Sequence, residues 1–134
     1  MTVVDASVVY KWFDQKEPSF EQAIALLETH IQGKTILLAP DILIYELTNA
    51  WTTKTAITVQ GAKTNLLKFQ ELGVELQPYT FPFMQKVMMF AQKYHVTMYA
   101  ASYAVLAQEK KCTLITADAK FVRQVNKPFV KLLY

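Results

Sequence analysis

The stretch Thr2-Val3-Val4-Asp5, close to the start of the chain, decides the fold. Its β-branched residues favour a short buried strand, and the acid that follows marks the end of that strand. A second run of this kind occupies residues 35–38 and is followed by a proline at position 40. We predict that both runs are strands in the interior of one sheet.

Outward from these two runs, the sequence alternates between extended and helical patterns. Further strands are predicted over residues 74–78, 112–116 and 129–132, the last of them at an edge of the sheet. Apolar residues recur at helical spacing in residues 21–31, 41–54, 58–72, 83–94 and 98–110. Strands that alternate with helices predict an α/β fold, with a mostly parallel sheet of about five strands covered by helices on both faces.

Length and composition limit the class of protein. A chain of 134 residues suits one domain, which we place at residues 1–134. Its hydrophobic content of 52% excludes a disordered protein, and a single cysteine excludes a disulfide scaffold. No apolar run reaches the roughly 18 residues of a membrane helix, and the chain starts without a secretory signal. We therefore expect one globular cytoplasmic domain without a membrane partner.

The two halves of the chain differ in charge. Residues 1–67 carry seven acids and five lysines, whereas residues 68–134 carry four acids, eight lysines and Arg123, so the halves have net charges of about −2 and +5. This asymmetry permits a polyanionic ligand on one side of the molecule. A solvated lysine-rich surface is the simpler explanation of the charge taken alone.

Three acids are expected at the end of the sheet where an open parallel sheet binds its ligand. Asp5 directly follows the first strand, and Asp118 lies two residues after the strand at 112–116. Glu46 lies about one and a half turns into the helix that follows the second strand, on a partly apolar face. A carboxylate on such a face costs free energy unless a cation or a donor compensates it.

Two interpretations of these acids stay open. Asp5 and Asp118 are also suitable N-caps for the helices that follow them, and Glu46 could pair with a lysine. Hard oxygen ligands that gather in one place instead suit Mg²⁺ or Mn²⁺. Glycine-rich phosphate-binding motifs are absent from the sequence, so a nucleotide-binding loop is not expected.

Four segments in order, at residues 3–8, 39–47, 97–107 and 114–121, resemble the PIN-domain ribonucleases, in particular the VapC-like toxins of type II toxin–antitoxin pairs. The resemblance implies a three-layer α/β/α fold and a Mg²⁺- or Mn²⁺-dependent endoribonuclease. Asp5, Glu46 and Asp118 stand at three acidic, metal-binding positions of that family. Ser7 and Thr116 match hydroxyl positions that support the acidic cluster.

One departure from the family pattern affects the chemistry. The third motif of the family has an aspartate directly after its first tyrosine, whereas this chain has Ala100 after Tyr99. Either the lineage lost the acid, or it was replaced to make a toxic nuclease tolerable. In both cases we expect an impaired enzyme, because one fewer carboxylate weakens metal binding and misplaces the attacking water.

The resemblance also implies partners. These are an RNA substrate, an antitoxin protein and a second copy of the chain in a homodimer. Candidate contact residues are Trp12, Trp51, Phe83 and Met88, each of which could instead fill the core of the monomer. The alternative function is a non-catalytic PIN-fold module that binds RNA or a protein.

Overall fold

The computed structural model describes residues 1–54 and 56–134. Five parallel strands form one sheet in the order β3-β2-β1-β4-β5. The strands are β1 (Thr2–Val4), β2 (Leu37–Pro40), β3 (Glu75–Gln77), β4 (Thr113–Thr116) and β5 (Val130–Leu132). The predicted parallel sheet is therefore confirmed, with the last strand at an edge.

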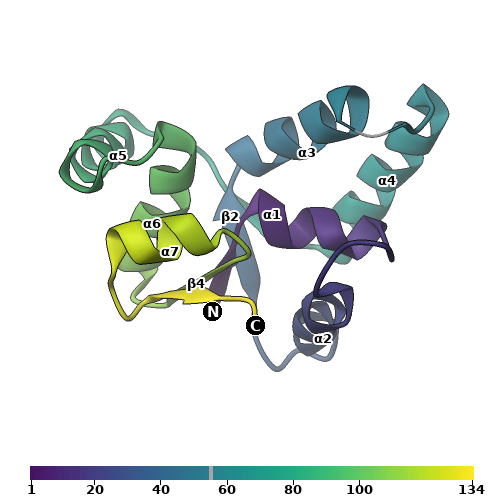
Figure 1. Ribbon diagram of the computed structural model, residues 1–134, viewed down its shortest axis with the longest axis horizontal. Coiled ribbons are helices and arrows are strands. Elements are labelled where there is room, and N and C mark those ends of the chain that lie inside the picture. The colour runs from purple at the N-terminus through teal and green to yellow at the C-terminus, as the bar shows by residue number, and fades with distance from the viewer. Residues whose placement is uncertain (55) are drawn as a thin grey trace.

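Eight helical segments connect the strands (Figure 1). They are α1 (Ala6–Val9), the 3₁₀ helix η1 (Tyr10–Phe13), α2 (Phe20–Ile31), α3 (Ile42–Thr53), α4 (Val59–Leu72), α5 (Phe81–Tyr94), α6 (Met98–Lys110) and α7 (Ala119–Val125), all within the described part of the chain.

The strand order explains the three layers. The chain moves from β1 to β2 and β3 in one direction, and returns across the sheet to β4 and β5 in the other. Right-handed crossovers then place the helices of the outward path and those of the return path on opposite faces. Figure 1 shows α1 to α4 on one side of the sheet and α5 to α7 on the other. The expected α/β/α fold is confirmed, and its topological switch point lies between β1 and β4.

The core contains the strands and one helix that is buried almost all round. Val3, Leu37 and Leu114 in the central strands have no exposed surface. All residues from 101 to 107 of α6 are buried, because α6 packs on β1, β2 and β4 while α5 covers its outer side. A helix that is apolar on most of its faces is expected in such a position.

Two details differ from the sequence-based expectation. The second strand starts at Leu37 rather than Thr35, because the N–H groups of Lys34 and Thr35 both donate to the Thr29 carbonyl at the end of α2. The extents of the short helices α1, η1 and α7 were not predicted, since segments of four to seven residues carry too little periodicity.

The described residues contain no helix with both the length and the apolar character needed to cross a bilayer.

Candidate active site

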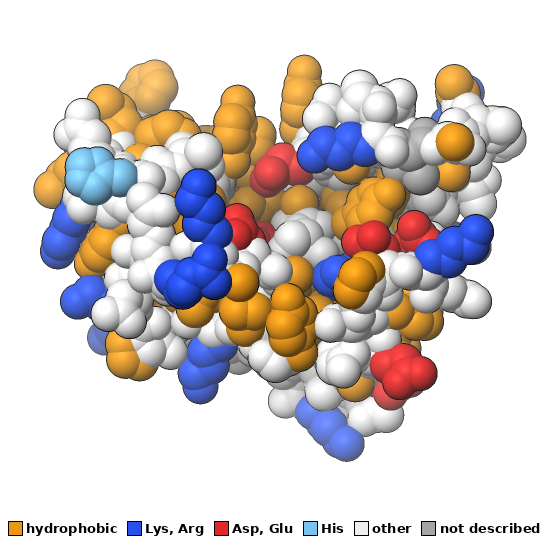
Figure 2. Space-filling model, viewed as in Figure 1, with side chains coloured by type: hydrophobic (Ala, Val, Ile, Leu, Met, Phe, Trp, Pro, Cys, Tyr) orange, Lys and Arg blue, Asp and Glu red, His pale blue; other side chains and the backbone are white. Residues whose placement is uncertain are grey.

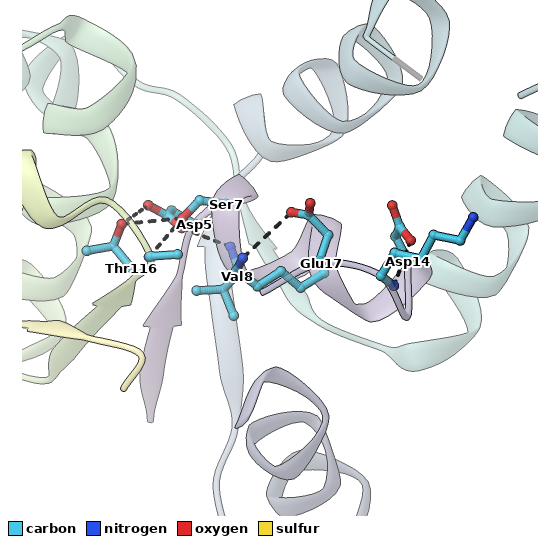
Figure 3. A network of polar contacts seen from close by, with 9 residues as sticks. Asp5, Ser7, Val8, Asp14, Glu17 and Thr116 are labelled. Carbon is cyan, nitrogen blue, oxygen red and sulfur yellow. Dashed lines mark hydrogen bonds and ion pairs between the residues drawn. The ribbon is translucent and has the colours of Figure 1, made fainter. Parts of the chain in front are cut away.

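Asp5 lies at the carboxyl end of β1, where α1 begins. Its Oδ1 accepts hydrogen bonds from the Ser7 hydroxyl at 2.5 Å and from the Val8 N–H at 3.3 Å. Its Oδ2 accepts a hydrogen bond from the Thr116 hydroxyl at 2.5 Å. Figure 3 shows the carboxylate between the Ser7 and Thr116 side chains. Residues that follow β1 and the last residue of β4 therefore fix the same carboxylate.

The loop after β4 fixes the direction of both hydroxyl hydrogen bonds. The Ala117 N–H donates to Ser7 Oγ at 2.9 Å, and the Asp118 N–H donates to Thr116 Oγ1 at 3.1 Å. Each hydroxyl accepts from a backbone amide and directs its single proton to Asp5. Two donors that point at one carboxylate favour its ionised form.

Burial acts against ionisation of Asp5. It raises the pKa of this carboxyl from 3.8 to about 6, although the hydrogen bonds from Ser7, Thr116 and Val8 lower the pKa. The negative charge of Glu46 raises the pKa of Asp5 further. Protein groups therefore do not fully compensate the charge of Asp5, and perturbed acids of this kind cluster at functional sites.

Glu46 reaches the same region from α3. Its Oε1 accepts a hydrogen bond at 2.6 Å from the hydroxyl of Tyr103, a residue of α6 that is only 2% exposed. Burial raises the pKa of Glu46, whereas the Tyr103 hydrogen bond and the charge of Lys54 lower it. Burial and the charges of Glu46 and Asp5 raise the pKa of Tyr103, so this hydroxyl stays protonated and donates. Tyr103 thus supplies the donor that the partly apolar setting of Glu46 requires.

Asp118 lies two residues beyond β4, and its carboxylate caps α7. Its Oδ1 accepts a hydrogen bond from the Phe121 N–H at 3.0 Å, and the residue is exposed. Asp5 and Asp118 are therefore both N-caps, as the structural alternative predicts. A capping bond occupies one oxygen, so a cap can also be a metal ligand.

Ala100 lies in the first turn of α6. Its N–H donates to the Thr97 hydroxyl at 3.1 Å, which caps this helix. Residue 100 stands three positions before Tyr103, so both side chains project from the same face of α6, one turn apart. Because the Tyr103 hydroxyl reaches Glu46, an acid at position 100 would lie on the side of α6 that faces this carboxylate. Ala100 is half-buried and packs against the core.

The acidic side chains differ in how well they fit a divalent metal ion. No three His, Cys, Asp or Glu side chains among residues 1–54 and 56–134 form a group arranged to hold a metal ion. The donor chemistry nevertheless fits Mg²⁺ or Mn²⁺, because such ions take one or two carboxylates and complete their coordination with water and substrate phosphate. Asp5 and Glu46, whose charges act on each other, are the pair that suits this kind of site.

Three residues near this centre were not predicted from the sequence as site residues. Tyr103 could have been found from the sequence, because it lies three residues after Ala100 and therefore on the same face of the helix. Asp41 directly follows β2, as Asp5 follows β1, and its side chain makes no capping hydrogen bond. Asp5 was selected because it directly follows a strand. The same criterion selects Asp41 only if the second strand is predicted to end at Pro40. Burial and the charges of Asp41 and Glu46 raise the pKa of Tyr79, so this side chain also borders the acidic centre.

A groove with a volume of about 530 Å³ opens beside the acidic centre. Ser7 and Ala117 line it next to Asp5, Glu46 lines it from α3, and Lys11 and Lys54 add positive charge. Figure 2 shows acidic side chains across the middle of this face of the molecule, with Lys and Arg side chains on both sides of them. Such a pattern suits a metal ion at the centre and an anionic strand along the flanks.

A family model describes this architecture. The model of the PIN domain matches residues 2–127, so the chain belongs to the PIN domain family, whose members are generally nucleases. A search of curated protein sequences finds no significant match.

Solved structures of other proteins share this fold. PAE2754 from Pyrobaculum aerophilum is 23% identical with a TM-score of 0.67, and the alignment covers 98% of this chain and 90% of that protein. VapC20 of Mycobacterium tuberculosis, a sarcin-ricin loop cleaving toxin, is 10% identical with a TM-score of 0.70 over 92% and 94% of the two chains. FitAcB from Neisseria gonorrhoeae is 16% identical with a TM-score of 0.66 over 98% and 96%. Because the sequence identities are this low, these similarities show a shared fold alone.

Proposed function

We propose that this chain is a toxin of the toxin–antitoxin type and a Mg²⁺- or Mn²⁺-dependent endoribonuclease that acts in the cytoplasm. The observation that carries the proposal is the Asp5 carboxylate, which Ser7 and Thr116 hold at the switch point of the sheet beside Glu46. Membership in the PIN family supports nuclease chemistry. The similarity to VapC20, a sarcin-ricin loop cleaving toxin, supports RNA as the substrate.

The roles of the side chains follow from their contacts. Asp5 and Glu46 would hold the metal ion, and Asp118, two residues beyond β4, is the proposed third ligand. When bound, the ion supplies a water nucleophile at neutral pH and neutralises charge on the phosphate. Ser7 and Thr116 position Asp5, and Tyr103 positions Glu46 through its 2.6 Å hydrogen bond.

We infer that Ala100 impairs the enzyme as the sequence is written. The methyl group at this position supplies no ligand on the side of α6 that faces Glu46. A missing carboxylate lowers the affinity for a cation and leaves the attacking water poorly placed. A displacement of about 1 Å can cost on the order of a hundredfold in rate.

The second candidate function is a PIN-fold module that binds RNA or a protein without cleaving it. Two observations favour it. The described residues lack a three-ligand metal group, and Asp5 and Asp118 both have a structural function as helix caps. Under this proposal, restoring an acid at position 100 leaves the protein inactive.

A cleavage assay separates the two functions. Ala100→Asp should cleave a sarcin-ricin hairpin RNA about a hundredfold faster than the chain as written, because it restores an acid on the face of α6 from which Tyr103 reaches Glu46. Cleavage should require Mg²⁺ or Mn²⁺ and stop when the metal is chelated. Gel analysis of end-labelled RNA measures the rates.

The controls are matched aspartate-to-asparagine changes in the Ala100→Asp background. Asp5→Asn should abolish the gain, whereas Asp14→Asn, which changes an acid outside the centre, should preserve it. If Ala100→Asp folds normally and stays inactive on hairpin and single-stranded RNA, the catalytic proposal is wrong and the binding module replaces it.

The structure corrects most of the expected contact residues for a partner. Trp12, Trp51 and Phe83 belong to the core cluster with at most 8% of their surface exposed, so they fill the interior of the monomer. Met88 is exposed on α5, as are Phe81 and Met89. We propose that a homodimer, or an antitoxin, covers these side chains of α5, since exposed apolar patches mark interaction sites.

A further inference from the structure

Lys11 is the buried charged side chain of the described residues that the catalytic proposal leaves unused. It belongs to η1, and 8% of its side chain is exposed. Lysine is seldom this buried unless it is paired. The ion pair available to Lys11 joins its Nζ to Glu17 Oε1 at 3.6 Å, beyond the 2.7–3.2 Å typical of N–H···O hydrogen bonds. The ammonium is therefore held loosely by one carboxylate.

Lys11 is one of the residues that line the groove beside the acidic centre. No buried side-chain nitrogen or oxygen in the described part of the chain lacks a hydrogen-bond partner, so the weakly paired Nζ must reach solvent. Lys11 reaches solvent at the groove of about 530 Å³ that it lines with Ser7, Ala117 and Glu46. Ser7 donates to Asp5, so this groove adjoins the proposed reaction centre.

A second lysine contributes to the same groove. Lys54, at the end of α3, lines the groove and lies close enough to Glu46 to lower the pKa of its carboxyl. Two ammonium groups beside a carboxylate centre attract an anion that extends past that centre. The groove volume falls within the roughly 300–1,000 Å³ of ligand sites, which suffices for part of a nucleotide strand.

We propose that Lys11 binds a phosphate of the RNA strand next to the phosphate that reacts at Asp5 and Glu46, and that Glu17 holds Lys11 in place until RNA displaces it. The proposal rests on the proposed function, which it extends by naming a substrate-binding residue. Lys54, which lines the same groove, assists. Lysine suits this role as a point charge for phosphate.

Substitutions of Lys11 and Glu17 should change RNA affinity in opposite directions, which tests the proposal. Lys11→Met keeps the apolar stem and removes the charge, so RNA affinity should fall about five- to tenfold at low salt. The slope of log Kd against log salt should fall by about one. Glu17→Gln removes the competing carboxylate, so RNA affinity should rise severalfold. Fluorescence anisotropy with a labelled hairpin RNA in the presence of a chelator, which prevents cleavage, measures both.

The Lys86–Glu109 pair provides the matched control. It joins α5 to α6 through an exposed ion pair at 2.9 Å, away from the groove. Lys86→Met and Glu109→Gln should leave RNA affinity within about twofold of the original value. Because Glu17→Gln retains Lys11, its result decides the question even if Lys11→Met fails to fold.

The outcomes separate this proposal from the proposed function. A purely structural ion pair predicts that Lys11→Met and Glu17→Gln lower the melting temperature together and change RNA affinity in the same direction, which would overturn the proposal. Unchanged affinity and salt slope in both variants would also overturn it, while RNA cleavage by Ala100→Asp would still support the function. If the chain as written binds no RNA at low salt and Ala100→Asp cleaves none, both proposals fall.

Discussion

Asp5 has two roles, as a helix cap and as a buried acid, and they place different demands on its carboxylate. As a helix cap it accepts the Val8 N–H, and as a buried acid it needs the Ser7 and Thr116 hydroxyls to remain ionised. These donors reduce the cost of its charge without removing it, since the pKa remains raised to about 6. Residual cost of this kind is typical of groups arranged for a ligand rather than for stability.

The raised pKa predicts how stability depends on pH. The folded chain binds the Asp5 proton more tightly than the unfolded chain does, so this group favours folding most below about pH 4. That contribution is lost as the pH rises towards 6. Asp5→Asn should therefore increase the free energy of unfolding by up to about 3 kcal/mol at pH 7.5 in metal-free buffer, and by much less near pH 4. Urea denaturation followed by circular dichroism at both pH values measures the difference, and a destabilised Asp5→Asn protein at pH 7.5 would contradict it.

Among the helices, α6 belongs both to the core and to the candidate site. Its buried residues 101–107 fix the helix against three strands, so Tyr103 meets Glu46 in one arrangement. The same rigidity decides what position 100 can do, because a side chain there is presented one turn from Tyr103. An acid at position 100 adds negative charge near Glu46, which should reduce stability in the absence of metal.

Tyr103→Phe tests this connection. The variant removes the hydroxyl that donates to Glu46 and leaves a half-buried carboxylate with one donor fewer. The free energy of unfolding should fall by about 1–3 kcal/mol at pH 7.5, and by less at a pH where Glu46 is protonated. Chemical denaturation at both pH values provides the measurement, with Tyr45→Phe at an exposed position of α3 as the control. An equal loss at both pH values would mean that packing, rather than the bond to Glu46, explains the effect.

The bounds of the helices show which parts of the fold can be predicted from sequence patterns. The spacing of apolar residues predicted α6 at residues 98–110 and placed α2, α3 and α4 within about one residue, because each spans three or more turns. The first two residues of α5, Phe81 and Pro82, were missed because the proline interrupts the apolar pattern there. Asp5 and Asp118 were selected as candidate site residues because each follows a predicted strand. The contact of Tyr103 with Glu46 could not be predicted in this way, because it depends on how α3 and α6 pack together.

The whole molecule places its acidic centre where the direction of the chain reverses. The carboxyl ends of β1 and β4 lie side by side there, and the backbone alone brings Asp5 to Thr116 although 111 residues separate them. This arrangement explains why four short motifs, each weak alone, are informative as a set. They occupy the parts of the chain that the parallel sheet gathers at one edge.

The apolar side chains exposed on α5 predict association of the whole molecule. Phe81 is 89% exposed and Met89 is 71% exposed, which is unusual for a chain that acts as a monomer. We expect sedimentation equilibrium to show a dimer at micromolar concentration. The double substitution Phe81→Lys and Met89→Lys should shift the protein to a monomer, whereas Leu67→Lys on α4 should not. A monomer at every concentration of the unchanged protein would contradict this prediction.

Metal binding by Asp5 and Glu46 is the property on which the proposed function depends most, since these residues are proposed to form a divalent metal site that Ala100 leaves incomplete. Titration of Mn²⁺, followed by its electron paramagnetic resonance signal, measures the affinity independently of any RNA. The chain as written should bind Mn²⁺ weakly, Ala100→Asp should bind it at least about tenfold more tightly, and adding Asp5→Asn should remove that gain. Equal Mn²⁺ affinity in the chain as written and in the folded Ala100→Asp protein would show that position 100 is not part of a metal site.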